Sequence, residues 1–92
     1  MHDEDYKLLV DQIIKHQESI IGPIALVEAS KVNGIKTQGR EITIEGDGKI
    51  VLQHLVEQYQ TLFGQASVEA CKDALRPLLP KMKGVDLPQI LL

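Results

Sequence analysis

The sequence predicts a mainly α-helical domain of the α+β class, with about four helices and a small β-hairpin between the second and third helices. Two observations lead to this fold class. Apolar residues recur at spacings of three and four over most of the chain, which is typical of helices with one buried face. Between residues 35 and 45 this spacing gives way to the β-branched residues Ile42, Thr43 and Ile44, which favour a strand.

The composition is that of one ordinary globular domain, because 43% of the 92 residues are apolar and 25% are charged. We divide the chain into a compact domain over residues 1–84 and an apolar C-terminal tail over residues 85–92. No apolar run approaches the roughly 20 residues that span a bilayer. The acidic start of the chain is unlike a signal peptide, and the single Cys71 makes no intramolecular disulfide. We therefore expect a cytoplasmic protein.

The first helix is expected from Asp3 to about Gln17. Its acidic first turn complements the positive end of the helix dipole. Its apolar face is formed by residues three and four apart, namely Tyr6, Leu9, Val10, Ile13 and Ile14. A second helix is expected over residues 23–32, because Pro23 suits the first turn of a helix and Asn33-Gly34 is a stop signal.

The second half of the chain predicts the hairpin and two further helices. The hairpin covers residues 35–45, with its turn at residues 38–40. The third helix runs over residues 49–63, with Asp47 or Gly48 near its N-cap and Gly64 just beyond its C-terminus. Ser67 is expected to cap a fourth helix, which prolines at positions 77 and 80 then kink or end.

The sequence shows no recognisable catalytic or cofactor motif, so we expect a protein that is not an enzyme and needs no cofactor or metal. The segment Gly46-Asp47-Gly48 resembles the middle of a calcium loop, but His54 then stands where that loop needs a bidentate Glu. The histidines His2, His16 and His54 lack the spacing of zinc ligands. Cys71 falls on the apolar stripe of the fourth helix, where a buried thiol is the simplest interpretation.

The charge pattern argues against nucleic acid as a partner. The net charge is −3, and the ten Lys and Arg residues are scattered through the chain and form no basic stripe. Apolar residues beyond the helical stripes occur at Ile20-Ile21, at Leu78-Leu79 and in the tail. The tail either folds back over its own domain or takes part in an interface with another chain.

Several segments resemble a small helical module at the C-terminal end of some prokaryotic signalling and regulatory proteins. The resemblance rests on residues 21–25 (Ile-Gly-Pro-Ile-Ala), 55–59 (Leu-Val-Glu-Gln-Tyr), 62–64 (Leu-Phe-Gly) and 69–72 (Glu-Ala-Cys-Lys). That module has no catalytic residues, so the resemblance implies an interaction domain.

Taken together, these features predict a non-catalytic, cytoplasmic protein-interaction or regulatory module that self-associates as a homodimer. The residues expected at the interface are Ile13, Ile20, Leu79, Ile90 and Leu91. The alternative is a small-ligand-binding sensory domain. Its pocket would lie between the hairpin and the third helix, lined by Ile42, Ile44, Leu52 and Leu55.

Overall fold

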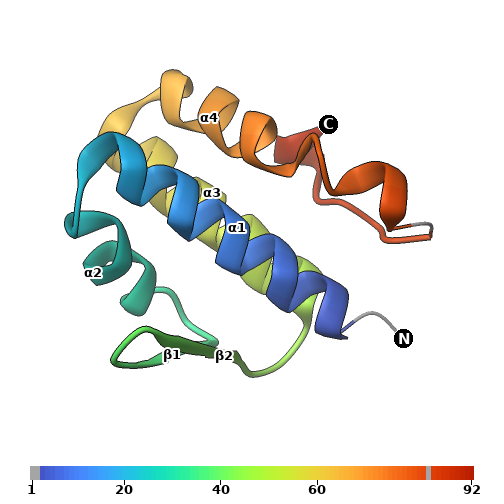
Figure 1. Cartoon of the computed structure of the whole chain (residues 1–92), viewed down its shortest axis with the longest axis horizontal. Helices are drawn as coiled ribbons and strands as arrows, with labels where there is room; N and C mark the ends of the chain where they lie inside the picture. The colour runs from blue at the N-terminus through green and yellow to red at the C-terminus, as the bar shows by residue number, and fades with distance from the viewer. Residues whose placement is uncertain (1–2, 83) are drawn as a thin grey trace.

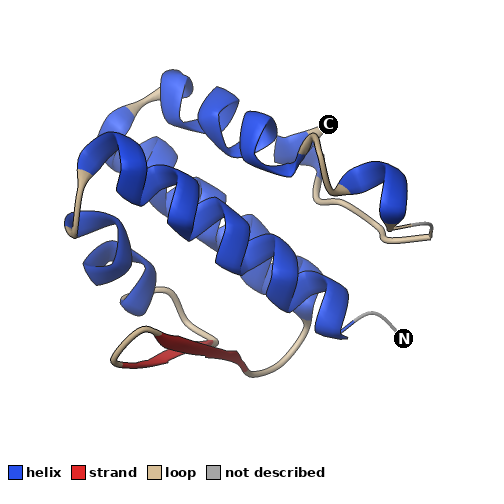
Figure 2. Ribbon diagram, viewed as in Figure 1, coloured by secondary structure: helices blue, strands red, loops and turns tan. Residues whose placement is uncertain are grey.

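A computed structural model describes residues 3–82 and 84–92 and confirms the predicted fold class (Figures 1 and 2). The α-helices are α1 (Asp3–Ile21), α2 (Ile24–Ser30), α3 (Gly48–Phe63) and α4 (Gln65–Leu75). The hairpin strands β1 (Ile35–Gln38) and β2 (Glu41–Ile44) lie between α2 and α3. Two short 3₁₀ turns, η1 (Leu79–Lys81) and η2 (Gln89–Leu91), follow α4.

The two longest helices, α1 and α3, pack side by side at the centre of the domain (Figure 1). Helix α4 packs against both of them along one side, and α2 with the hairpin covers the other side. Apolar side chains from all these elements meet in one core. Its largest fully buried members are Tyr59, Leu9, Ile13, Ile14, Leu52, Leu55 and Leu75.

Helix α1 is one turn longer than predicted, because it continues through Ser19 and Ile20 to Ile21. The amide of Gly22 still donates to the carbonyl of Glu18 at 2.9 Å. Pro23 has no amide to continue the helix and disfavours the helical conformation of the residue before it, so α1 ends just ahead of Gly22 and Pro23. Helix α2 ends at Ser30, earlier than predicted, because the next two amides bond to carbonyls three residues back, as in a 3₁₀ turn.

The hairpin matches its predicted range, and its turn has two residues. Gln38 pairs with Glu41 across the antiparallel strands, which leaves Gly39 and Arg40 as the loop. Gly39 has a φ of +62°, whereas Arg40 keeps a negative φ, which is the pattern of a type II′ turn with glycine at the first position. The hairpin buries Ile42 against the helices and leaves most of its other side chains exposed.

The two ends of α3 are set by the residues that the sequence indicated. The Asp47 carboxylate accepts hydrogen bonds from the amides of Lys49 at 3.0 Å and Ile50 at 3.4 Å, so Asp47 is the N-cap. Gly64 alone joins α3 to α4, with a φ of +81° and a ψ of −169°, a conformation that is essentially restricted to glycine.

The prediction that Ser67 caps α4 is wrong. Helix α4 begins at Gln65, directly after Gly64, so Ser67 is its third residue and lies buried. The Ser67 hydroxyl makes no hydrogen bond within the described residues. A single glycine turns the chain sharply enough to start the helix three residues earlier than a cap at Ser67 would.

The C-terminal tail folds back onto its own domain. Leu91 is buried, and η2 packs against α3 and α4. The Tyr6 hydroxyl donates to the carbonyl of Asp86 at 2.6 Å, and the Asp86 carboxylate pairs with Lys49 at 2.8 Å. Of the two arrangements that the sequence left open for the tail, the structure shows the one in which it covers its own helices.

Candidate functional site

The apolar side chains that the fold leaves exposed are concentrated at one end of the molecule. In the part of the chain that the structure describes, eight large apolar residues are exposed. Five of them lie where α1 passes into α2 and where α3 ends. We call these five the corner face: Ile20, Ile24, Val27, Leu62 and Phe63.

A buried glutamine holds the last turns of α1 against the start of α4. Gln17 is 1% exposed, and its amide donates to the carbonyl of Ser67 at 3.1 Å and to the sulfur of Cys71 at 3.4 Å. Ile20 lies one turn beyond Gln17, and Phe63 directly precedes the corner that leads to Ser67. The bonds of Gln17 therefore bring Ile20 to the end of α3.

A second pair of hydrogen bonds fixes α2 on α3. The buried Tyr59 hydroxyl donates to the carbonyl of Ala25 at 2.7 Å, and the Gln58 amide donates to the Glu28 carboxylate at 2.9 Å. From Gln58 to Tyr59 the bonding partner on α2 changes from Glu28 back to Ala25, so the two helices run in opposite directions here. Ile24 and Leu62 each lie one turn beyond the Glu28–Gln58 bond, on the same side of it.

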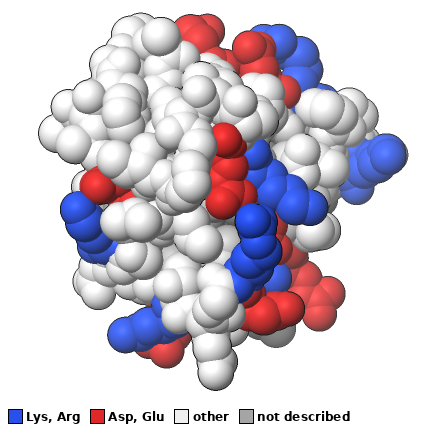
Figure 3. Space-filling view, turned by 60° about the vertical axis from the view of Figure 1, so that its left-hand side comes forward, with Lys and Arg blue, Asp and Glu red and all other residues white. Residues whose placement is uncertain are grey.

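The corner face carries no charge of its own. The segments 19–27 and 58–68, which contain it, have no Asp, Glu, Lys or Arg. Figure 3 brings the left-hand side of Figure 1 forward and shows a broad area at its upper left that is largely free of charged side chains. Glu28, which directly follows the first of these segments, is 7% exposed and pairs with Lys31 at 2.9 Å.

Only one of the five residues predicted at an interface belongs to this face. Ile20 is 57% exposed, whereas Ile13 is fully buried between the helices and Leu91 is buried where the tail packs on α3 and α4, so neither side chain is part of the surface. Leu79 and Ile90 are partly buried and pack on the core. The segments that carry these two lie on the other side of Figure 1 from the α1–α2 corner.

Sequence reasoning missed Ile24, Val27, Leu62 and Phe63, because their helical spacing places them among core residues. The signal that could have found them is the absence of charge from the two segments around them. A solvated helix face normally carries charged residues, so eleven uncharged residues at a helix end and corner are unusual.

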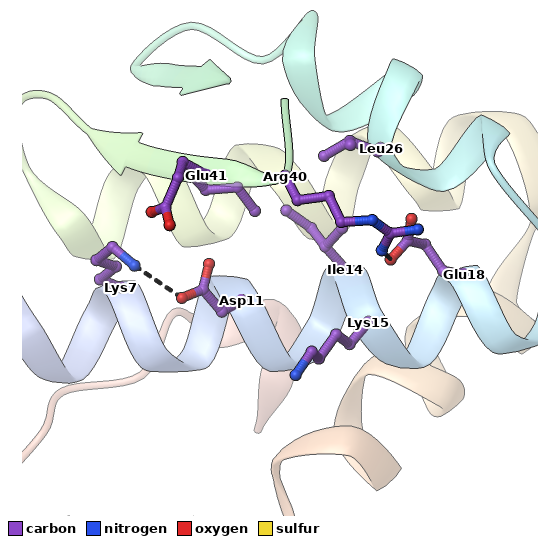
Figure 4. A pocket seen from close by; sticks show the side chains of 9 residues that line it. Lys7, Asp11, Ile14, Lys15, Glu18, Leu26, Arg40 and Glu41 are labelled. Carbon is purple, nitrogen blue, oxygen red and sulfur yellow. Dashed lines mark hydrogen bonds and ion pairs between the residues drawn. The ribbon is translucent and has the colours of Figure 1, made fainter. Parts of the chain in front are cut away.

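A hollow of about 300 Å³ lies between α1 and the hairpin (Figure 4). Its apolar lining is Ile14, Leu26 and Ile42, and charged residues surround it. Lys7 pairs with Asp11 at 2.9 Å, and Arg40 approaches Glu18 at 4.0 Å across the hollow. Of the four residues expected to line a pocket between the hairpin and α3, Ile42 lines this hollow, whereas Leu52 and Leu55 are fully buried in the core.

The candidate metal ligands of the sequence are not brought together. His2 lies outside the described residues, and within residues 3–82 and 84–92 no three His, Cys, Asp or Glu side chains are placed to share a metal ion. Cys71 is buried, as predicted. Burial raises the pKa of its thiol to about 11, against the lowering effect of the hydrogen bond from Gln17, so the thiol is protonated near neutral pH.

A comparison with protein-family models, with curated proteins and with solved structures found no match. The resemblance to a signalling module therefore stays a hypothesis. None of the helices in the described ranges has the length and apolar character that a membrane crossing requires.

Proposed function

We propose that this protein is a non-catalytic, cytoplasmic interaction or regulatory module that associates with a second copy of itself. The observation that carries the proposal is the corner face, where five of the eight exposed large apolar residues in the described ranges gather on an uncharged surface. Scattered exposed apolar residues are normal in any protein, but a contiguous group marks a surface that a partner covers.

The rest of the fold supports an interaction module because it assigns other roles to the polar residues that could serve chemistry. Asp47 caps α3, Ser67 and Cys71 are buried in α4, and the Asp86 carboxylate fastens the tail to Lys49. These groups are used in building the domain. The corner face, in contrast, has no structural role that the described contacts reveal.

The proposal is tested by the mass of the whole chain in solution. Sedimentation equilibrium of the purified protein from about 1 μM to about 1 mM covers the range in which weak interfaces form. We expect the average mass to rise above the 10.2 kDa of one chain as concentration increases. A mass of 10.2 kDa throughout the range contradicts self-association.

Removal of the tail is not a clean test of this proposal. Truncation after Gly84 would uncover the core that Leu91 and Pro88 fill, and it would remove the bond between Tyr6 and Asp86. A change in mass would then report a damaged fold. Point substitutions at exposed positions are the better test of self-association, because they leave the core intact.

The second candidate is a small-ligand-binding sensory domain, and the observation that favours it is the hollow of Figure 4. Its volume is at the lower end of the range for ligand sites. Cations and carboxylates surround an apolar lining, which fits a small zwitterion with an apolar body. Titration of the ¹⁵N-labelled protein with leucine or betaine tests it, and shifts confined to the amides of Ile14, Arg40 and Ile42 would support it.

A further inference from the structure

We infer that the partner of the corner face is the corner face of a second copy, so that two chains form a closed dimer with twofold symmetry. This inference rests on the proposed function, and it adds that the corner faces contact each other, the symmetry of that contact and its expected strength. The tail, η1 and the hairpin then lie outside the contact.

The absence of charge makes the corner face complementary to itself. When two identical surfaces meet about a twofold axis, a charged residue near the axis faces its own copy and is repelled. Neither uncharged segment contains a charged residue that would face its own copy in this way. The 13 acidic and 10 basic residues lie outside both segments, and the nearest in sequence, Glu18, Glu28, Glu57 and Glu69, directly flank them.

A head-to-tail arrangement would need a second apolar surface to receive the corner face. Apart from the C-terminal Leu92, the remaining exposed large apolar residues in the described ranges are Leu8 and Ile50. Each lies in the N-terminal half of its helix, and Lys7 and Lys49 directly precede them. The described surface therefore offers the corner face no better complement than another corner face.

The corner face is preformed, which lowers the entropic cost of association. It is built mainly on helix ends, and buried hydrogen bonds of Gln17 and Tyr59 fix those ends to their neighbours. The backbone of this surface therefore needs little ordering when a partner arrives. Such surfaces usually bind without large backbone movement.

The size of the surface predicts a reversible dimer. A standard stable interface uses roughly 20 to 30 residues from each partner. The two uncharged segments contain 20 residues, of which 16 are at least partly exposed. The contact is therefore somewhat smaller than standard, and we expect a dissociation constant of about 1 to 100 μM.

Two matched substitutions on α3 test the location of the contact. Leu62 and Ile50 lie on the same helix and are 47% and 49% exposed, so Leu62→Lys and Ile50→Lys remove similar apolar surface and add the same charge. Circular dichroism melting curves first establish that both variants fold. We expect Leu62→Lys to weaken the dimer about 100-fold and Ile50→Lys to leave the dissociation constant within about twofold of the unchanged chain.

A mixing experiment tests the symmetry. At concentrations near the dissociation constant of the unchanged chain, Leu62→Lys and Leu62→Glu should each sediment as monomers of 10.2 kDa, because each places like charges on the two facing surfaces. Mixed in equal amounts, they should recover a dimer with one chain of each kind, because the facing charges are then opposite. The mass of the unchanged chain should level off at twice 10.2 kDa.

The outcomes separate this inference from the proposed function. An unchanged chain that stays monomeric contradicts both. A dimer that survives Leu62→Lys, or that Ile50→Lys weakens equally, keeps self-association and removes the corner face from it. A mass that climbs beyond the dimer, or a mixture that does not recover it, overturns the twofold arrangement.

Discussion

The hydroxyl of Tyr6 donates a hydrogen bond of 2.6 Å to the backbone carbonyl of Asp86, which lies 80 residues further along the chain. The ring of Tyr6 packs so closely over Gly48 that an added Cβ there would meet ring carbons at 2.5 and 2.6 Å. Lys49, the next residue, pairs with the Asp86 carboxylate. One cluster therefore joins the first turn of α1, the first turn of α3 and the C-terminal tail.

Replacement of Tyr6 by Phe keeps the ring over Gly48 and removes only the bond to the tail. We expect the free energy of unfolding to fall by about 1 kcal/mol, which is typical of one such hydrogen bond. Urea denaturation measures the loss. Hydrogen exchange locates it, because the Leu91 amide, which donates to the Pro88 carbonyl at 3.0 Å, should lose protection. Unchanged exchange at Leu91 would show that the tail is held without Tyr6.

Asp47→Ala should cost about 1 kcal/mol of stability, because two amides in the first turn of α3 lose their acceptor. Asp47→Asn should be nearly neutral, since asparagine caps as well as aspartate. Glu45→Ala is the control, because it also removes one exposed negative charge, just ahead of the cap. Thermal and urea denaturation of the three variants measure the difference. If Glu45→Ala were as costly as Asp47→Ala, net charge and not capping would explain the effect.

The features that the sequence predicted correctly depend on residues close to one another in the chain. Helical periodicity gave α3 and the apolar face of α1, because one buried face repeats every three or four residues. The cap at Asp47 and the turns at Gly39 and Gly64 depend on local backbone geometry, for which each residue type has a clear preference.

The features that it missed depend on contacts between distant residues. Nothing near Tyr6 indicates that Asp86 will lie beside it. Spacing alone likewise gives Ile13 and Ile20 the same apolar character on α1, but the neighbouring elements cover Ile13 completely and leave Ile20 57% exposed. Leu62 and Phe63 continue the apolar pattern of α3 past the last residue that other elements cover. Which apolar residues remain exposed is thus decided by where the packed elements end.

Ser67→Ala should leave stability unchanged or raise it by up to about 1 kcal/mol. The Ser67 hydroxyl is buried without a hydrogen-bond partner among the described residues, and an unpaired buried polar group is unfavourable. Alanine also has the higher helix propensity. Urea denaturation measures the change in the free energy of unfolding, and a loss of about 1 kcal/mol is the result that a capping serine would give.

The buried neighbour Gln17 provides the contrast. Gln17→Ala removes two hydrogen bonds and leaves a cavity, so it should lower the free energy of unfolding by about 2 to 4 kcal/mol in the same urea denaturation experiment.

Cys71 should make the protein less stable at alkaline pH. Burial raises the pKa of its thiol from 9.0 to about 11, so between these values the unfolded chain releases a proton that the folded chain retains. The resulting contribution to stability is fully present below pH 9 and is lost as the pH rises towards 11. Urea denaturation at several pH values between these limits measures the slope of the free energy of unfolding against pH, and Cys71→Ala should make that slope shallower by the equivalent of one proton.

Burial also raises the pKa of Tyr59, so part of the slope should persist in the Cys71→Ala variant. Equal slopes in the two proteins would contradict a buried, protonated thiol, as would rapid reaction of native Cys71 with iodoacetamide at pH 8.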